Sequence, residues 1–150
     1  MRTIAVLPCG KRKIWDKSID TGPSKVEDVY IGTLHLLTRQ YAELFADDWV
    51  ILSAKHGFRS RNEIINNNYD LTFGMRHPCE VTEEVLKRQR DRKEMGKYDR
   101  AIILTGKKHQ HVITSIGGIT KDDHYPLLGT KGIGEMQQRL KQAIETNEPI

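Results

Sequence analysis

Four short apolar runs in this chain lack the alternation of a half-exposed strand, and each leads into a small loop of glycine with lysine or histidine. Uninterrupted apolar runs predict strands that are buried on both faces, as in a parallel sheet. Parallel strands end along one edge, where open α/β folds bind ligands. Glycine admits a close ligand and lysine attracts an anion, so these loops predict one basic edge suited to a phosphate-bearing ligand. The runs are residues 4–7, 49–53, 101–104 and 124–128, and their loops are residues 8–13, 54–57, 105–109 and 129–134.

The segments between the runs predict helices over residues 26–45, 82–96, 108–115 and 134–144. The first helix has an apolar stripe of Leu34, Leu37, Tyr41, Leu44 and Phe45. The alternation of strands and helices predicts a single α/β domain over residues 1–150, a three-layer α/β/α arrangement with a short, mainly parallel four-stranded sheet.

Residues 58–79 are the irregular part of the chain, rich in turn and cap residues such as 66-NNNYD-70. About twenty residues of loop in a compact domain indicate either a functional segment or an unrecognised short element.

Composition excludes several classes of protein. The chain is 37% hydrophobic and 29% charged, as in a globular domain, and no apolar run approaches the roughly 20 residues that span a bilayer. Cys9 and Cys79 form neither a disulfide framework nor a metal-ligand spacing, and His109 and His111 do not share a helix face. We therefore expect a reduced, cytoplasmic protein with no metal, no cofactor and no membrane partner. The net charge of +4 is compatible with nucleic acid.

Ser53, Lys55 and His56 form the densest polar cluster, at the end of a buried strand where polar groups are costly unless they have a role. Cys9 is a second candidate, because the positive charge of Lys11 nearby lowers a thiol pKa and favours a nucleophile. The alternatives are capping and packing for the cluster, and a small buried residue for the cysteine.

Asp70 is the main carboxylate candidate, positioned to activate water or stabilise a cationic transition state, with Tyr69 stacking on a base or sugar. Asp16 is the second carboxylate candidate. An Asx turn or helix cap is the alternative for Asp70. The loop 129-GTKGIG-134 opens a helix whose free N–H groups suit an anion, although a turn without ligand fits it equally.

Four segments in order carry a resemblance to a known family: 9-CGKRK-13, 51-ILSAKHGF-58, 69-YDLTF-73 and 126-PLLGTKGIG-134. The chain resembles an uncharacterised bacterial and phage domain family. Phe58 and Phe73 stand where that family usually has leucine, and Asn68 where it often has proline. More distantly, the arrangement is similar to the uracil-DNA glycosylase-like fold and, in its Ser-x-x-His-Gly pattern, to domains associated with tRNA deazaguanine modification. The defining glycosylase motifs are absent.

This resemblance implies a DNA glycosylase-type enzyme that hydrolyses the N-glycosidic bond of a nucleobase, most simply a modified base in DNA, in repair or phage defence. Asp70 would align water, His56 would contact the departing base, and Lys55 would offer a Schiff-base alternative. Ser53 and Cys9 would lie at the substrate. Phosphate would be held by the side chains of Lys11, Lys13, Lys107 and Lys108 and by the backbone of Gly10, Gly132 and Gly134. The alternatives are a non-catalytic module that binds nucleotide or nucleic acid, and a Cys9–His56 hydrolase of a small metabolite.

Overall fold

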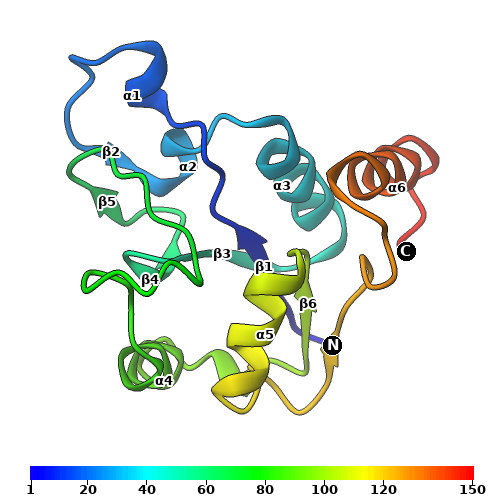
Figure 1. Cartoon of the computed structure of the whole chain (residues 1–150). Helices are drawn as coiled ribbons and strands as arrows, with labels where there is room; N and C mark the ends of the chain where they lie inside the picture. The colour runs from blue at the N-terminus through cyan, green and yellow to red at the C-terminus, as the bar shows by residue number, and fades with distance from the viewer.

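A five-stranded sheet in the order β4-β3-β1-β6-β7 forms the centre of the computed structural model, which describes residues 1–150 (Figure 1). Strands β1, β3, β6 and β7 are parallel, and β4 runs antiparallel to β3. The strands are β1 (Thr3–Pro8), β3 (Asp48–Ser53), β4 (Gly57–Ser60), β6 (Arg100–Ile103) and β7 (Asp123–His124).

The parallel centre of the sheet follows from the apolar runs. All six residues of β1 are buried, and Val6 lies opposite Val50 on one side and Ile103 on the other. A strand flanked on both edges and covered on both faces has no exposed side, which is why its sequence shows no alternation. The prediction of an α/β fold with a largely parallel sheet is therefore confirmed.

The sheet differs from the prediction in being mixed and having five strands. The chain reverses after β3 through Gly57, whose φ of +72° suits glycine, and β4 then pairs back onto β3. The sequence predicts irregular loop from residue 58 onward, and this is wrong for the part that forms β4. β7 has only two residues, shorter than the apolar run at 124–128, because Pro126 lacks the N–H that a longer ladder needs.

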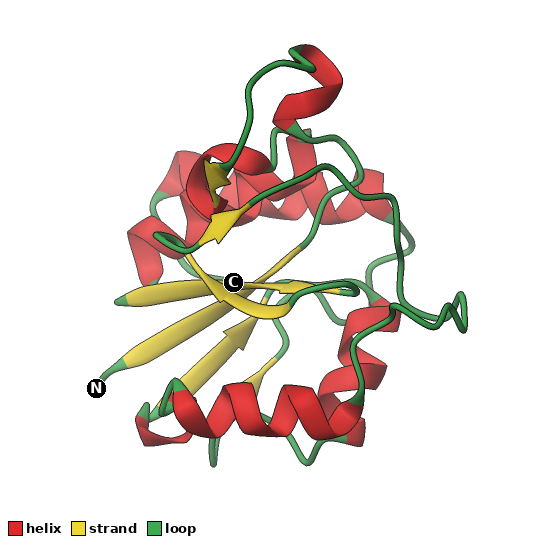
Figure 2. Ribbon diagram, turned by 90° about the vertical axis from the view of Figure 1, so that its left-hand side faces the viewer, coloured by secondary structure: helices red, strands yellow, loops and turns green.

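Helices cover both faces of the sheet (Figure 2). α3 packs against β1 and β3 and also contacts α6, whereas α4 packs against β4. The helices are α1 (Ile14–Lys17), α2 (Val26–Val29), α3 (Thr33–Phe45), α4 (Glu83–Arg92), the short 3-10 helix η1 (Met95–Lys97), α5 (Lys107–Ser115) and α6 (Ile133–Thr146).

The single helix expected over residues 26–45 is wrong, because the chain breaks at Tyr30 between α2 and α3. Tyr30 has extended backbone angles and forms a bridge with Lys13. The buried side of α3 also departs from the apolar stripe: it carries His35 and Thr38, whereas Leu44 is 51% exposed. The local apolar pattern extends across the break and therefore conceals it.

Residues 58–79 contribute one strand, β5 (Ile64–Ile65), to a second, two-stranded antiparallel sheet, and its partner is β2 (Ser24–Lys25). This pairing ties the irregular segment to the loop after α1. The residues that follow β5 then lie beside α1, as the hydrogen bond from Asn68 to Asp16 shows. None of the helices combines the length and apolarity that crossing a membrane requires.

Candidate functional site

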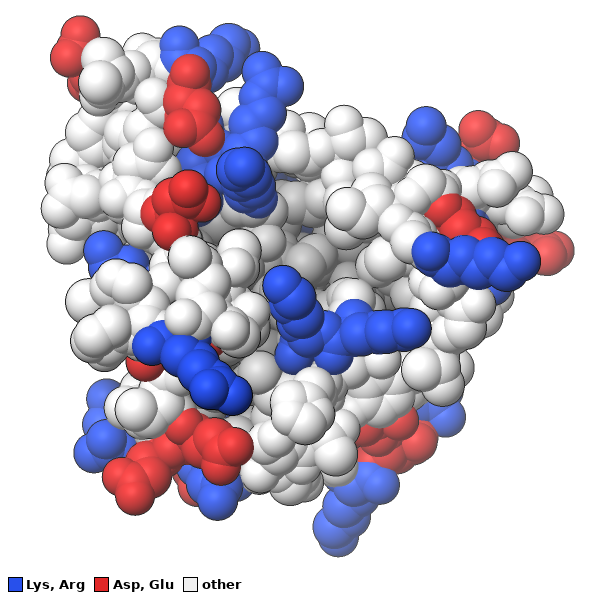
Figure 3. Space-filling view, in the orientation of Figure 1, with Lys and Arg blue, Asp and Glu red and all other residues white.

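The loop after β1 and the segment after β5 enclose a pocket of about 580 Å³. We call it the carboxylate pocket. Figure 3 shows basic and acidic side chains side by side over the loop after β1, at the rim of a hollow. Five of its six lining residues are polar, and the whole set is Lys11, Arg12, Asp16, Asn68, Tyr69 and Asp70. The structure thus brings together four of the predicted site residues: Lys11, Asp16, Tyr69 and Asp70.

The two carboxylates of this pocket differ in how far they are already engaged. Asp16 accepts hydrogen bonds from the backbone N–H of Lys13 at 2.8 Å and from the Asn68 amide at 3.1 Å. These bonds hold the pKa of the Asp16 carboxyl below its ordinary value. The Asp70 carboxylate is exposed and makes no hydrogen bond or ion pair within the chain. Asp16 therefore serves the local fold, while Asp70 remains free for a ligand.

A buried hydroxyl network supports the pocket from below. Tyr69 is 9% exposed, and its hydroxyl bonds to the hydroxyl of Tyr30 and, at 2.8 Å, to Ser53 Oγ. Ser53 Oγ also accepts the backbone N–H groups of Lys55 and His56. Burial raises the pKa of Tyr69 and Tyr30, so both remain protonated. Ser53 thus anchors the Tyr69 ring to the end of β3.

Lys13 lies beneath the pocket rather than on its surface. It is 3% exposed, its Nζ lies 4.3 Å from the centre of the Tyr69 ring, and it donates a hydrogen bond to the Lys11 carbonyl at 3.0 Å. Burial lowers the pKa of Lys13. The ammonium therefore stabilises the aromatic floor by a cation–π contact, while the exposed Lys11 and Arg12 form the basic rim.

Lys55 and His56 approach the same ring but do not line the pocket. The His56 ring meets Tyr69 edge-on at 5.0 Å between centres, and its Nε2 is buried without a partner. Burial lowers the pKa of His56 to about 4, with Arg59 and Lys55 adding to the effect, so the imidazole is neutral at pH 7. The exposed Lys55 places its Nζ 5.8 Å from the centre of the Tyr69 ring.

Cys9 pairs with a different histidine from the one expected. Its Sγ lies 3.5 Å from Nε2 of His109, the third residue of α5, and it makes no hydrogen bond with His56. Burial raises the thiol pKa, and the lowering effect of Lys13 does not offset it. The expected net lowering of the Cys9 pKa is therefore wrong, although the positive charge of Lys13 acts in the expected direction. Burial also holds the pKa of His109 at about 4, so neither member of the pair carries charge at neutral pH.

The remaining basic residues gather in a second pocket of about 360 Å³ between the starts of α5 and α6, which we call the helix-end pocket. Lys107, Lys108 and Gly132 line it together with Thr105. Gly10 and Gly134 line neither of the two pockets. The structure therefore divides the residues predicted to hold phosphate between two places on the edge where the parallel strands end.

A comparison with known proteins places the chain among relatives of unknown function. Residues 4–142 match the model of a family of unknown function, DUF6884. The chain belongs to this family. It is also 41% identical over 150 residues to the uncharacterized protein YfjM of Bacillus subtilis (strain 168), with full coverage of both chains. The expectation of an uncharacterised bacterial family is thus confirmed.

Among solved structures, the chain is similar to the crystal structure of AF0587, a protein of unknown function, with a TM-score of 0.41 and 15% sequence identity. The match covers 99% of this chain and 46% of that one, so the chain spans about half of the length of AF0587.

Sequence reasoning missed several residues that shape the site. Tyr30 completes the hydroxyl network, and Asn68 holds Asp16. His35 is buried in α3 and bonds the Pro8 carbonyl through Nδ1 at 3.0 Å, at the end of β1. The sequence places His109 in the basic loop 105–109 but does not predict its contact with Cys9. Its place two residues into the helix after a predicted strand was the available signal that it faces the strand ends.

Proposed function

We propose that the chain hydrolyses the N-glycosidic bond of a nucleobase in DNA, with a modified base as the expected substrate. The observation that carries the proposal is the unengaged carboxylate of Asp70, which shares one pocket with an aromatic ring and a basic rim. Glycoside cleavage passes through an oxocarbenium-like transition state, which a neighbouring carboxylate stabilises.

In the proposed reaction Asp70 orients a water molecule toward C1′ of the sugar and accepts its proton as the new C–O bond forms. The C1′–N bond breaks, its electron pair leaves with the base, and the base takes up a proton. His56 is neutral, and its ring packs edge-on against the ring of Tyr69. In this scheme the departing base displaces part of the packing between these two rings and then contacts His56. A Schiff base formed by Lys55 with the exposed sugar remains the alternative route.

Binding of DNA follows from the same pocket. An enzyme that acts on a base in DNA must take it out of the stack, and basic side chains hold the flanking phosphates. The exposed Lys11 and Arg12 at the rim supply such charges. A pocket of about 580 Å³ lies within the range of small-molecule sites and has room for one nucleoside.

The proposal also includes three wider expectations that follow from the sequence. They are a three-layer arrangement of the uracil-DNA glycosylase type, a cytoplasmic location, and a role in DNA repair or phage defence. The parallel strands with the pocket at their C-terminal ends support the first of these, since ligands bind there in open α/β sheets.

The test is mass spectrometry of free bases after incubation of the protein with several DNAs, both unmodified and carrying modified bases. Asp70→Asn is expected to lower base release by about 10² to 10⁴, the usual contribution of a positioned proton acceptor. Asp20→Asn, at another exposed position, serves as the matched control and is expected to retain full activity. Because Asp70 makes no bond within the chain, Asp70→Asn is expected to keep the melting temperature of the parent.

Full activity of Asp70→Asn would exclude this residue as the carboxylate. Salt-sensitive retention of DNA without release of any base would instead favour the binding module, because phosphate contacts alone give salt-dependent affinity.

A further inference from the structure

The helix-end pocket lies between two helix starts, and neither has a side-chain cap. α5 begins after Gly106 and α6 begins after Gly132, and both glycines line the pocket. The first N–H groups of a helix have no partner within it, and the helix dipole makes this end positive. Helices of nine and fourteen residues thus present free N–H groups and partial positive charge to one cavity.

The side chains around the cavity add to this positive charge. Three lysines line it, Lys107, Lys108 and Lys131, and no aspartate or glutamate does. The acidic group closest in sequence is Glu135 in the first turn of α6. Its carboxylate accepts the backbone N–H of Lys131 at 3.2 Å and pairs with Arg139 at 3.6 Å, so its charge is already partnered. The pocket therefore has an uncompensated positive charge.

A buried hydroxyl without a partner provides an independent indication of a ligand. Thr105 is fully buried at the end of β6 and lines the pocket, and its Oγ1 makes no hydrogen bond. The Thr105 carbonyl, by contrast, accepts a bond from the Gln110 amide at 2.9 Å. Buried polar atoms are nearly always bonded, so an orphan hydroxyl on the wall of a basic pocket indicates an absent acceptor.

We propose that the helix-end pocket binds a phosphate monoester, as found on a nucleotide or on the 5′ end of a nucleic acid strand. A monoester carries up to two negative charges and three free oxygens, and so it uses two helix ends, three ammonium groups and a hydroxyl more fully than an internal phosphodiester. Leu128 and Ile133 are 65% and 61% exposed on the pocket wall, next to where the organic part of the ester would lie. Only the assignment of this phosphate to the substrate of the carboxylate pocket rests on the proposed function.

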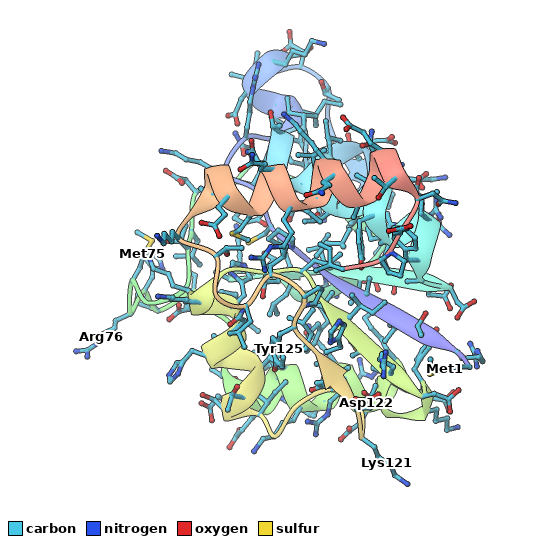
Figure 4. The ribbon with its side chains drawn as sticks, turned by 90° about the vertical axis from the view of Figure 1, so that its right-hand side faces the viewer. Met1, Met75, Arg76, Lys121, Asp122 and Tyr125 are labelled. Carbon is cyan, nitrogen blue, oxygen red and sulfur yellow. The ribbon has the colours of Figure 1, made fainter.

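Figure 4 shows α5 and α6 together, with α6 above α5 and starting on the side where Met75 and Arg76 project. Lys121 and Asp122 lie toward the opposite, lower side of the molecule. The exposed Lys121 and Lys141 line neither pocket, and so provide a control that removes the same charge elsewhere.

The experiment measures calorimetric binding of thymidine 5′-monophosphate, thymidine and inorganic phosphate to the full chain. It also measures anisotropy with one oligonucleotide carrying either a 5′-phosphate or a 5′-hydroxyl. We expect the phosphorylated member of each pair to bind at least tenfold more tightly. If only the mononucleotide shows the preference for the phosphorylated form, the ligand is a free nucleotide. If the oligonucleotide shows it as well, the ligand is the 5′ end of a strand.

The variants separate the pocket from general charge. The Lys107→Ala/Lys108→Ala variant is expected to abolish the tenfold preference, whereas Lys121→Ala/Lys141→Ala retains it. Thr105→Val removes only the hydroxyl and is expected to weaken monophosphate binding at least threefold. Its melting temperature is expected to be at least that of the parent, because valine replaces a buried hydroxyl that makes no hydrogen bond in the chain.

Equal affinity for the phosphorylated and unphosphorylated ligands would overturn the proposal, as would an unchanged preference in Lys107→Ala/Lys108→Ala. Inorganic phosphate serves as the reference for phosphate recognition without the organic part. The outcome is independent of catalysis: phosphate binding that persists while no base is released from any DNA would refute the proposed function alone.

Discussion

The hydroxyl network under the carboxylate pocket allows the most direct test of the structure, by Tyr69→Phe. This substitution removes one oxygen and keeps the ring that contacts Lys13 and His56. The hydroxyl of Tyr30, 1% exposed, then loses its hydrogen bond to Tyr69. Ser53 Oγ loses one of three bonds and keeps the two backbone donors from Lys55 and His56.

The expected cost follows from these two losses. An orphaned buried hydroxyl costs about 1–3 kcal/mol, and one lost hydrogen bond of ordinary strength costs about 0.5–1.5 kcal/mol. Tyr69→Phe is therefore expected to lower the free energy of unfolding by about 2–4 kcal/mol. For a chain of this size that corresponds to a fall in melting temperature of roughly 5–15 °C.

Urea denaturation followed by circular dichroism measures this loss against a matched control. Tyr98→Phe removes a hydroxyl that bonds to the exposed side chain of Asp48, where water replaces it, and is expected to cost less than about 1 kcal/mol. The Tyr30→Phe/Tyr69→Phe variant removes both partners of the buried bond, so it is expected to cost less than the two single substitutions added together. A loss below about 0.5 kcal/mol in Tyr69→Phe, or full additivity in the double variant, would refute the network.

Two further predictions concern titratable groups. Burial lowers the pKa of His35 to about 4 from 6.5, so between these values the unfolded chain binds a proton that the folded chain does not. The free energy of unfolding is thus expected to decrease as the pH is lowered from 6.5 to about 4. His35 contributes up to about 1.4 kcal/mol per pH unit to this decrease. His35→Gln would flatten that slope in urea titrations and the exposed His111→Gln would not; equal slopes would contradict the prediction. Burial raises the pKa of the Cys9 thiol, so iodoacetamide at pH 7.5 is expected to modify the exposed Cys79 at least about ten times faster by intact-protein mass spectrometry, and preferential alkylation of Cys9 would contradict it.

The parts of the fold that were predictable from sequence are those decided by local composition. Fully buried strands such as β1 need apolar residues at every position, and a run of four or more is visible without knowledge of the partner. The helix start at Thr82 was equally readable, because its hydroxyl accepts the Val85 N–H as an ordinary cap. The start of α5 was predicted to within one residue.

The features that escaped prediction depend on distant partners. Pairing of β4 with β3 follows from the reversal at Gly57, which Gln89 stabilises by bonding the chain on either side of the turn. The break between α2 and α3 depends on the bridge between Tyr30 and Lys13, which are seventeen residues apart in the sequence. Nothing in the local pattern near Tyr69 indicates that its hydroxyl meets Ser53 and Tyr30.

The candidate site also had a part that local sequence predicts and a part that depends on distant partners. The loops that would carry polar groups to the edge could be predicted, because they follow the strands. Which of these polar groups is available to a ligand could not be predicted, since it depends on which carboxylate is hydrogen-bonded within the fold. Asp16 and Asp70 are both plausible catalysts by residue type, and only the bonds from Lys13 and Asn68 to Asp16 distinguish them.

The distribution of charge along the edge favours a ligand with two chemically different parts. The carboxylate pocket combines acids, bases and a ring, whereas the helix-end pocket contains lysines and free N–H groups but no acid. The loops that lead into them follow β1 and β6, which are neighbouring strands, about 4.8 Å apart in any sheet. A phosphate placed directly beside Asp70 would be repelled by its carboxylate, and the helix-end pocket has no carboxylate that could activate water. Two pockets that differ in this way suit a nucleotide unit, whose glycosidic bond and phosphate are joined through one sugar and require opposite electrostatic environments.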